Sequence, residues 1–212
     1  MRKVVLLIVL GIIFISEIEA KKIEGQILFK DDTVDVIFKI PIDLLTQEII
    51  YEKLQYKVKY FDFNGKKIKL IPDNAEEIRF KYNNEDIRML SRYNSLDIGD
   101  IFSMRTNIFL KLKVEGKLML FEYHYTQKTG SMSKGIPNDM TMPVGMSYPV
   151  ERYNILQKGD GELKRPKGLS FRKDMMNYFS DCPELSQKIE NKEYKKRDLE
   201  SIVRFYNSNC GK

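Results

Sequence analysis

The chain has 212 residues, of which 42% are hydrophobic and 31% are charged, and its formal net charge is +6 at pH 7. This mixed composition excludes low-complexity disorder, a coiled coil and a polytopic membrane protein. A chain of this length buries about 70% of the surface that its unfolded form exposes, so it needs no metal or dense disulfide framework to fold. The single histidine excludes metal sites and mechanisms that require two.

Residues 1–20 have the three parts of a secretory signal peptide. Arg2 and Lys3 form a basic start, residues 4–15 carry no charge and are almost all apolar, and Ala20 offers a small residue at the cleavage position. An apolar run of this length is too short to cross a bilayer core of about 30 Å. We therefore expect cleavage and export to the periplasm or the extracellular space. The alternatives are a buried first strand and an uncleaved anchor.

The positive charge is spread along the chain and is only mildly concentrated near its end. Residues 161–212 contain 12 Lys or Arg against 8 Asp or Glu. For an exported protein, such a balance favours acidic glycans, lipopolysaccharide or phospholipid headgroups as partners over nucleic acid. Because the charges are interspersed, a solvated lysine-rich surface is the competing interpretation.

Both cysteines, Cys182 and Cys210, lie close to the end of the chain. In an oxidising compartment an isolated pair of this kind predicts one disulfide. Two free or metal-binding thiols are the alternative, but there is no CxxC spacing and no nearby histidine. A lipid anchor would need a cysteine directly after the leader, and the first cysteine is Cys182. We expect a soluble exported protein without a lipid anchor.

Residues 21–157 predict a β-rich domain. Apolar and polar residues alternate over 23–29 and again over 34–40, which predicts a hairpin across Asp31-Asp32 whose second strand ends at Pro41. Residues 42–54 fit either a helix or a strand. Further strands are predicted over residues 56–60, 68–70, 78–82, 87–90, 108–114, 118–125 and 148–156, with turns at Asn64-Gly65, Asn83-Asn84 and Glu115-Gly116.

After a predicted linker over residues 158–169, the apolar period changes from two to 3.6. Residues 170–212 form a predicted helical tail, with Ser170 as the cap of its first helix and Pro183 near the start of a second segment. The predicted buried stripes are Phe171, Met175, Tyr178 and Phe179 in the first helix, and Leu199, Ile202, Val203 and Tyr206 in the last. The expected fold class is α+β: an antiparallel sheet or partial barrel followed by a helical tail that packs on it.

Glu122 and His124 are a candidate catalytic pair, because they lie two residues apart on one predicted strand and share a face. As an orienter and a base they would suit an enzyme, but no recognisable motif places a nucleophile beside them. An ordinary strand-end histidine is the competing interpretation. The chain also lacks GxSxG, HExxH, Walker and GxGxxG patterns, so we expect no catalytic residue, cofactor or metal.

Four of the ten methionines fall in the irregular segment 127–148: Met132, Met140, Met142 and Met146. Thioethers bind Cu(I), and the spacing of Met140 and Met142 suits a soft metal. No cysteine or histidine accompanies them, and methionine also packs adaptable loops and partner surfaces. We therefore favour a loop that packs or contacts a ligand or partner.

Several segments resemble a group of secreted Bacteroidota proteins of unknown function. They are IEGQI at residues 23–27, FLKLKVEGKLMLFEY at 109–123, DCPEL at 181–185, and Ile202-Val203 followed by YNSNC at 206–210. The resemblance implies an exported β-rich domain with a C-terminal helical unit. It implies no catalytic residue, ligand or cofactor, and the methionine-rich segment is not part of it.

The expected function is that of a non-enzymatic binding or interaction module of the periplasm or cell surface. Its partner would be an envelope protein or an anionic glycan or lipid surface, with no role for nucleic acid. The alternatives are an enzyme with an unfamiliar carboxylate- or tyrosine-based site and a structural protein of the envelope. We expect no transmembrane segment once the leader has been removed.

Overall fold

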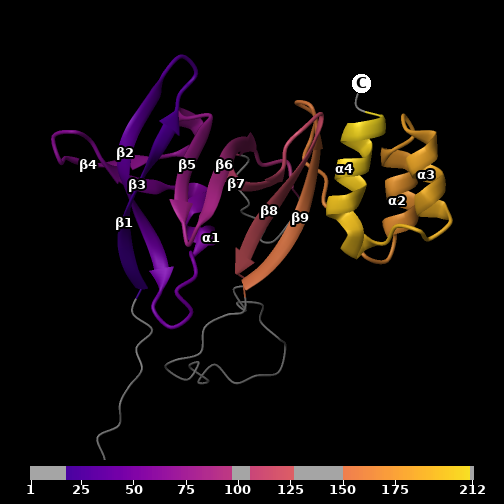
Figure 1. Cartoon of the computed structure of the whole chain (residues 1–212), viewed down its shortest axis with the longest axis horizontal. Coiled ribbons are helices and arrows are strands. Elements are labelled where there is room, and N and C mark those ends of the chain that lie inside the picture. The colour runs from indigo at the N-terminus through magenta and orange to yellow at the C-terminus, as the bar shows by residue number, and fades with distance from the viewer. Residues whose placement is uncertain (1–17, 97–105, 127–149, 211–212) are drawn as a thin grey trace, which may run out of the picture.

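A computed structural model of the chain describes residues 18–96, 106–126 and 150–210. Its strands form one antiparallel sheet in the order β4-β3-β2-β1-β5-β6-β7-β8-β9, which is not closed into a barrel (Figure 1). The predicted α+β class is thus confirmed. The strands are β1 (Ile18–Leu28), β2 (Thr33–Asp43), β3 (Val58–Phe61), β4 (Lys67–Leu70), β5 (Glu77–Tyr82), β6 (Glu85–Tyr93), β7 (Asn107–Val114), β8 (Leu118–Thr126) and β9 (Val150–Lys158).

The first hairpin is longer than predicted at both ends. β1 begins at Ile18, so it includes the last three residues of the predicted leader, and cleavage after Ala20 stays a prediction. The prediction that Pro41 ends β2 is wrong, because the strand continues to Asp43. The carbonyl of Pro41 accepts a hydrogen bond from the Ile50 amide at 3.0 Å. This carbonyl therefore points away from β1. The nitrogen and oxygen of one strand residue point to the same side, so an amide proton at Pro41 would also face away from β1, and its absence costs no hydrogen bond to that strand.

The ambiguous segment after β2 contains a short helix, α1 (Tyr51–Tyr56). Tyr56 therefore ends a helix rather than starting a strand, and β3 begins at Val58. The physical reason is burial, because a helical turn brings both Leu54 and Gln55 against the sheet, where each is 1% exposed.

The predicted turns are confirmed, and their backbones show why these residues occur there. Gly65 has φ 72°, and Asn83 and Asn84 have φ 49° and 65°. Positive φ at both central residues is the requirement of the tight two-residue hairpin turn, and asparagine tolerates it better than most residues. β6 then runs from Glu85, directly after this turn, to Tyr93, well beyond the predicted segment.

One face of the sheet carries two apolar clusters. Met89 of β6 pairs with Lys111 of β7, and Lys111 pairs with Glu122 of β8, so all three side chains point to this face. The α1 cluster includes Ile27, Phe38, Ile40, Leu54, Ile78, Phe80 and Met89. The tail cluster includes Leu118, Leu120, Leu156, Met175, Phe179, Leu185, Ile202 and Val203. A third cluster on the opposite face includes Leu90, Ile108, Leu110, Met119, Phe121, Tyr123 and Ile155. β8 is thus covered on both faces, as its apolar sequence predicts.

The tail consists of three short helices that lie beside β8 and β9, with α4 nearest the sheet (Figure 1). They are α2 (Phe171–Tyr178), α3 (Pro183–Glu190) and α4 (Leu199–Asn209), with the 3-10 helix η2 (Lys196–Asp198) before α4. The predicted stripes are buried, except that Tyr178 is only half-buried. Ser170 stands at the cap position of α2 but makes no capping hydrogen bond. Its hydroxyl donates instead to the carboxylate of Asp174.

Among the residues that the structure describes, no helix is both long and apolar enough to span a membrane.

Candidate functional site

Glu122 and His124 do meet on one face of β8, as the alternation predicts. The His124 Nε2 atom lies 2.7 Å from Glu122 Oε1, and the imidazole is 6% exposed. The second oxygen of Glu122 lies 3.8 Å from the Lys113 ammonium. The hydrogen bond from His124 holds the pKa of Glu122 below its ordinary value, against the opposing effect of burial, and the nearby Lys111 and Lys113 charges act in the same direction.

Three further side chains complete this site, and the sequence analysis missed them. The ring of Tyr51 lies 4.8 Å from the His124 ring, centroid to centroid. The Lys111 ammonium lies 4.7 Å from the centroid of the Tyr51 ring and 2.7 Å from Glu85 Oε1. The one available signal was the hairpin register, which sets Lys111 opposite Glu122. We call Tyr51, Glu85, Lys111, Glu122 and His124 the His124 cluster.

Burial and pairing perturb the ionisable groups of the His124 cluster in opposite directions. Loss of solvent raises the pKa of Tyr51, and the Lys111 charge offsets only part of that rise. Loss of solvent also acts to lower the pKa of Lys111, but its hydrogen bonds to Glu85 and Tyr51 outweigh this, so the net shift is upward. Lys111 and Glu122 therefore stay charged near neutral pH.

Gln55 of α1 anchors the same region through the backbone of β8. Its side-chain oxygen accepts a hydrogen bond from the His124 amide at 2.7 Å, and its nitrogen donates to the His124 carbonyl at 3.0 Å. The paired ladder between β7 and β8 reaches only Lys111 opposite Glu122, so His124 lies beyond it. The Gln55 amide thus satisfies two buried backbone groups that no neighbouring strand binds there.

The charged side chains of the His124 cluster are paired with groups of opposite charge or with the imidazole. Glu85 faces Lys111, and Glu122 faces both His124 and Lys113. Among the described residues there is no group of three or more His, Cys, Asp or Glu side chains that could hold a metal ion. Such a cluster can orient an imidazole and keep it in one position, and its charges are already matched inside the protein.

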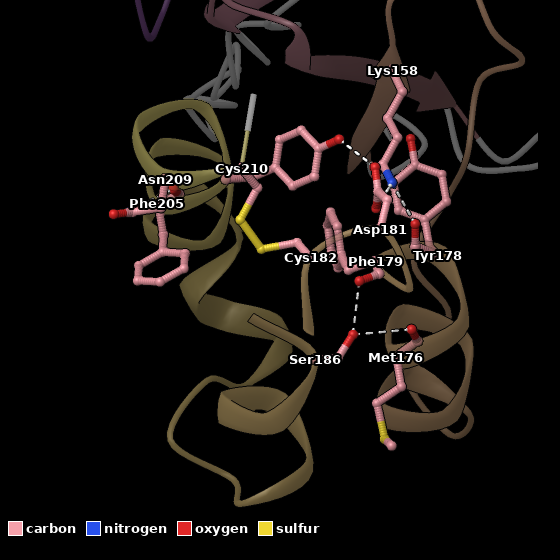
Figure 2. The surroundings of a disulfide bond; sticks show 11 residues. Lys158, Met176, Tyr178, Phe179, Asp181, Cys182, Ser186, Phe205, Asn209 and Cys210 are labelled. Atoms are coloured by element: carbon pink, nitrogen blue, oxygen red, sulfur yellow. Dashed lines mark hydrogen bonds and ion pairs between the residues drawn. A yellow bond between two sulfur atoms is a disulfide. The ribbon is translucent and has the colours of Figure 1, made fainter. Parts of the chain in front are cut away.

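The predicted disulfide is confirmed. Cys182 and Cys210 are joined across a separation of 28 residues, with their Cα atoms 5.6 Å apart, and no free cysteine is present among the residues with assigned positions (Figure 2). The bond links the residue before α3 to the residue after α4. It therefore closes the tail on itself rather than tying the tail to the sheet.

Lys158, at the end of β9, is one of the residues that tie the tail to the sheet (Figure 2). Its ammonium donates to the Tyr178 carbonyl at 2.5 Å and to the Asp181 carboxylate at 2.6 Å. It also lies 4.7, 5.2 and 4.9 Å from the ring centroids of Tyr178, Phe179 and Tyr206. The cation is thus held by aromatic faces and a carboxylate together.

The hydroxyl of Tyr206 completes this attachment by donating to Asp181 at 2.5 Å. Burial and this hydrogen bond raise the pKa of Tyr206 to about 12. For Asp181, burial acts to raise the pKa, but the hydrogen bonds from Lys158 and Tyr206 outweigh it and lower the pKa. Near neutral pH the attachment therefore contains one cation, Lys158, and one anion, Asp181, while Tyr206 is neutral.

The outer side of the tail carries a hollow of about 630 Å³. We call this feature the tail hollow. It lies between the start of α2 and the segment that joins α3 to α4. Its lining includes the cations Arg172, Lys173, Lys192, Lys195 and Lys196, the apolar residues Leu169, Phe171 and Met176, and Gly168, Ser170, Asn177 and Tyr194. The sequence showed only a mild positive excess in this part of the chain, because the cations come from two separate segments.

The methionines proposed for a ligand loop or for copper, Met132, Met140, Met142 and Met146, lie outside the described residues. Both interpretations of them therefore stay predictions.

Comparison of the chain with protein-family models, with curated proteins and with solved structures finds no match.

Proposed function

We propose that this protein is an exported binding module that recognises anionic groups through the tail hollow. The observation that carries the proposal is the composition of the lining. Among the described residues that form it, five are cationic and none carries a carboxylate. A concave surface of one charge sign attracts ligands of the opposite sign and raises their local concentration.

The acidic residues next to the hollow form no ion pair with its five lining cations within the described part of the chain. The Asp174 carboxylate accepts from Ser170, the Asp198 carboxylate accepts from the Lys195 amide, and Glu193 pairs with Lys188. None of the five lining cations forms an ion pair with any residue that the structure describes. Their charge is thus available to a partner, which is not true of Lys111 or Lys158.

The His124 cluster supports binding over catalysis as the general function. A general base needs a free ring nitrogen or carboxylate that faces a substrate. Here the His124 imidazole is 6% exposed and the Glu122 side chain 16%, so burial leaves little of either group open to a substrate. The cluster joins α1 to one face of the sheet, where a satisfied polar network helps to fix the position of the helix.

The disulfide supports the export part of the proposal, because structural disulfides persist in oxidising compartments. The partner then belongs to the envelope or the cell surface, where acidic glycans and phosphate-bearing lipids supply the anionic groups.

Titration with a soluble polyanion tests the proposal. Dextran sulfate is added to the full mature chain, and binding is measured by calorimetry at several salt concentrations, with neutral dextran as the ligand control. We expect binding to dextran sulfate alone, and we expect it to weaken as salt screens the charges.

A matched pair of variants locates the site. K195E/K196E reverses two lining cations, whereas K30E/K53E makes the same net change on two separate exposed lysines away from the hollow. We expect the first to weaken binding at least tenfold and the second to change it less than threefold. Equal losses in the two variants, or no binding by the wild type, would refute the tail hollow as the site.

A further inference from the structure

We propose that the tail hollow docks on an anionic membrane surface and that Leu169 inserts among the lipids. This inference rests on the proposed anion-binding function and names the class of partner. It comes from an apolar side chain that stands fully exposed at the lining of the tail hollow, together with cations that form no ion pair among the described residues.

Leu169 has no packing role in the described part of the protein. Its exposed fraction is 109%, the highest among the large exposed hydrophobic residues that the structure describes. Leu45 is the other strongly exposed leucine among the described residues, at 74%, but it lies between the carboxylates of Asp43, at the end of β2, and Glu48. Leu169 thus combines a fully exposed aliphatic side chain with a cationic setting.

The hollow brings the cations to Leu169 from two segments that are distant in sequence. Arg172 and Lys173 lie three and four residues after it, in the first turn of α2, where the exposed amides of a helix also favour anions. Lys196 reaches across from η2, and its ammonium lies 3.9 Å from where a Cβ atom on Gly168 would be. The charges thus form a rim beside one apolar projection.

Lys192 belongs to the same rim and adopts an uncommon backbone conformation. It has φ 65°, in the left-handed region that glycine fills most easily at the end of a helix. A lysine at this position gives up the conformational ease of glycine and places another cation on the hollow. This choice of residue agrees with a role for charge at this surface.

A membrane fits this surface better than a soluble polyanion because only a membrane offers a place for Leu169. Phosphate groups match the cationic rim, and the headgroup boundary accepts a leucine side chain. Reversible attachment to membranes commonly needs two such signals together, one electrostatic and one apolar. An acidic polysaccharide would use the rim and leave Leu169 in water.

Vesicle sedimentation separates these possibilities. The full mature chain is mixed with vesicles of phosphatidylcholine that contain phosphatidylglycerol, or with vesicles of phosphatidylcholine alone, and the dextran sulfate titration is run in parallel. We expect sedimentation with the anionic vesicles only. K195E/K196E should lower the partition coefficient at least tenfold, since each cation near an anionic surface contributes roughly fivefold.

The decisive variant is Leu169→Ser, with Leu45→Ser as its matched control. We expect Leu169→Ser to lower vesicle binding about tenfold and to leave dextran sulfate binding within twofold, whereas Leu45→Ser changes neither. Both side chains are exposed, so both variants should fold, which circular dichroism checks.

Each of the other possible outcomes would overturn one or both of the proposals. Dextran sulfate binding without vesicle binding would overturn the membrane inference and leave the proposed function in place. Vesicle binding that is unaffected by Leu169→Ser would overturn the insertion step. Failure of the wild type to bind either probe would overturn both proposals.

Discussion

The His124 cluster and the tail hollow are both rich in charged side chains, but the protein uses them in opposite ways. In the cluster each described charge faces an opposite charge, and the imidazole is nearly buried. In the hollow the cations are exposed and face no carboxylate among the residues that the structure describes. Burial makes an unpaired charge costly, so the first set is paired internally, whereas water tolerates the second.

The difference shows how a polar site can be judged without a bound ligand. Perturbed pKa values mark functional sites in many proteins, but ion-pair networks with a structural role perturb them as well. The pairing of the perturbed groups decides between the two here. The compensated set holds α1 and the sheet together, and the uncompensated set is the better candidate for a partner.

The largest expected effect comes from removing the anchor of the cluster. Gln55→Leu keeps a side chain of similar size but leaves the amide and the carbonyl of His124 without their partners. We expect the free energy of unfolding to fall by about 2–4 kcal/mol, because two buried polar groups lose their hydrogen bonds. Urea denaturation monitored by circular dichroism measures this. A loss under about 1 kcal/mol would mean that water reaches these groups and that the cluster is less buried than described.

The next effect concerns acid stability. The pKa of Glu122 is lower in the folded chain than its ordinary value of 4.5, so its contribution to stability is complete above that value. The contribution is lost as the pH falls through the folded pKa, because the unfolded chain then binds the proton more readily. We expect Glu122→Gln to cost about 1–2 kcal/mol at pH 7 and to flatten part of the decline at acid pH.

Urea denaturation at a series of pH values checks this second prediction. The exposed Glu24 of β1 provides the matched control, as Glu24→Gln changes the same charge without touching the cluster. Identical pH profiles for Glu122→Gln and the wild type would show that the pair with His124 adds no stability.

The smallest effect is expected where the charges are unpaired. K195E/K196E should change the free energy of unfolding by no more than about 0.5 kcal/mol, because exposed side chains away from packed features rarely matter for stability. The same measurement in urea tests this. If the double variant unfolded as readily as Gln55→Leu, the hollow would be part of the structural framework, and the contrast between the two regions would disappear.

Local patterns of the chain predict much of this fold. The alternation in β1, β2, β7 and β8, the asparagine and glycine turns, and the stripes of α2 and α4 all depend on residues close together in sequence. The errors occur where distant contacts override local preference. Pro41 continues a strand because the amide proton that it lacks would face no strand partner, and Tyr56 ends a helix because Leu54 and Gln55 are buried against the sheet.

The candidate sites divide in the same way. Glu122 and His124 share a face because alternation along one strand decides it, and the two cysteines pair because no others exist. Tyr51, Lys111 and Glu85 could not be added without the register of three strands and the position of α1. Lys158, assigned from sequence to a linker, becomes an anchor only because the tail folds back over β9.

The sequence by itself determined the class of the fold, the order of its elements and the cysteines that close the tail, because periodicity, turn chemistry and the count of cysteines are local or enumerable properties. Only the tertiary structure decided which charges are neutralised and which are not. Pairing depends on distances between segments far apart in the chain, and the mild average charge of the last 52 residues concealed a hollow whose lining cations form no ion pair with any described residue.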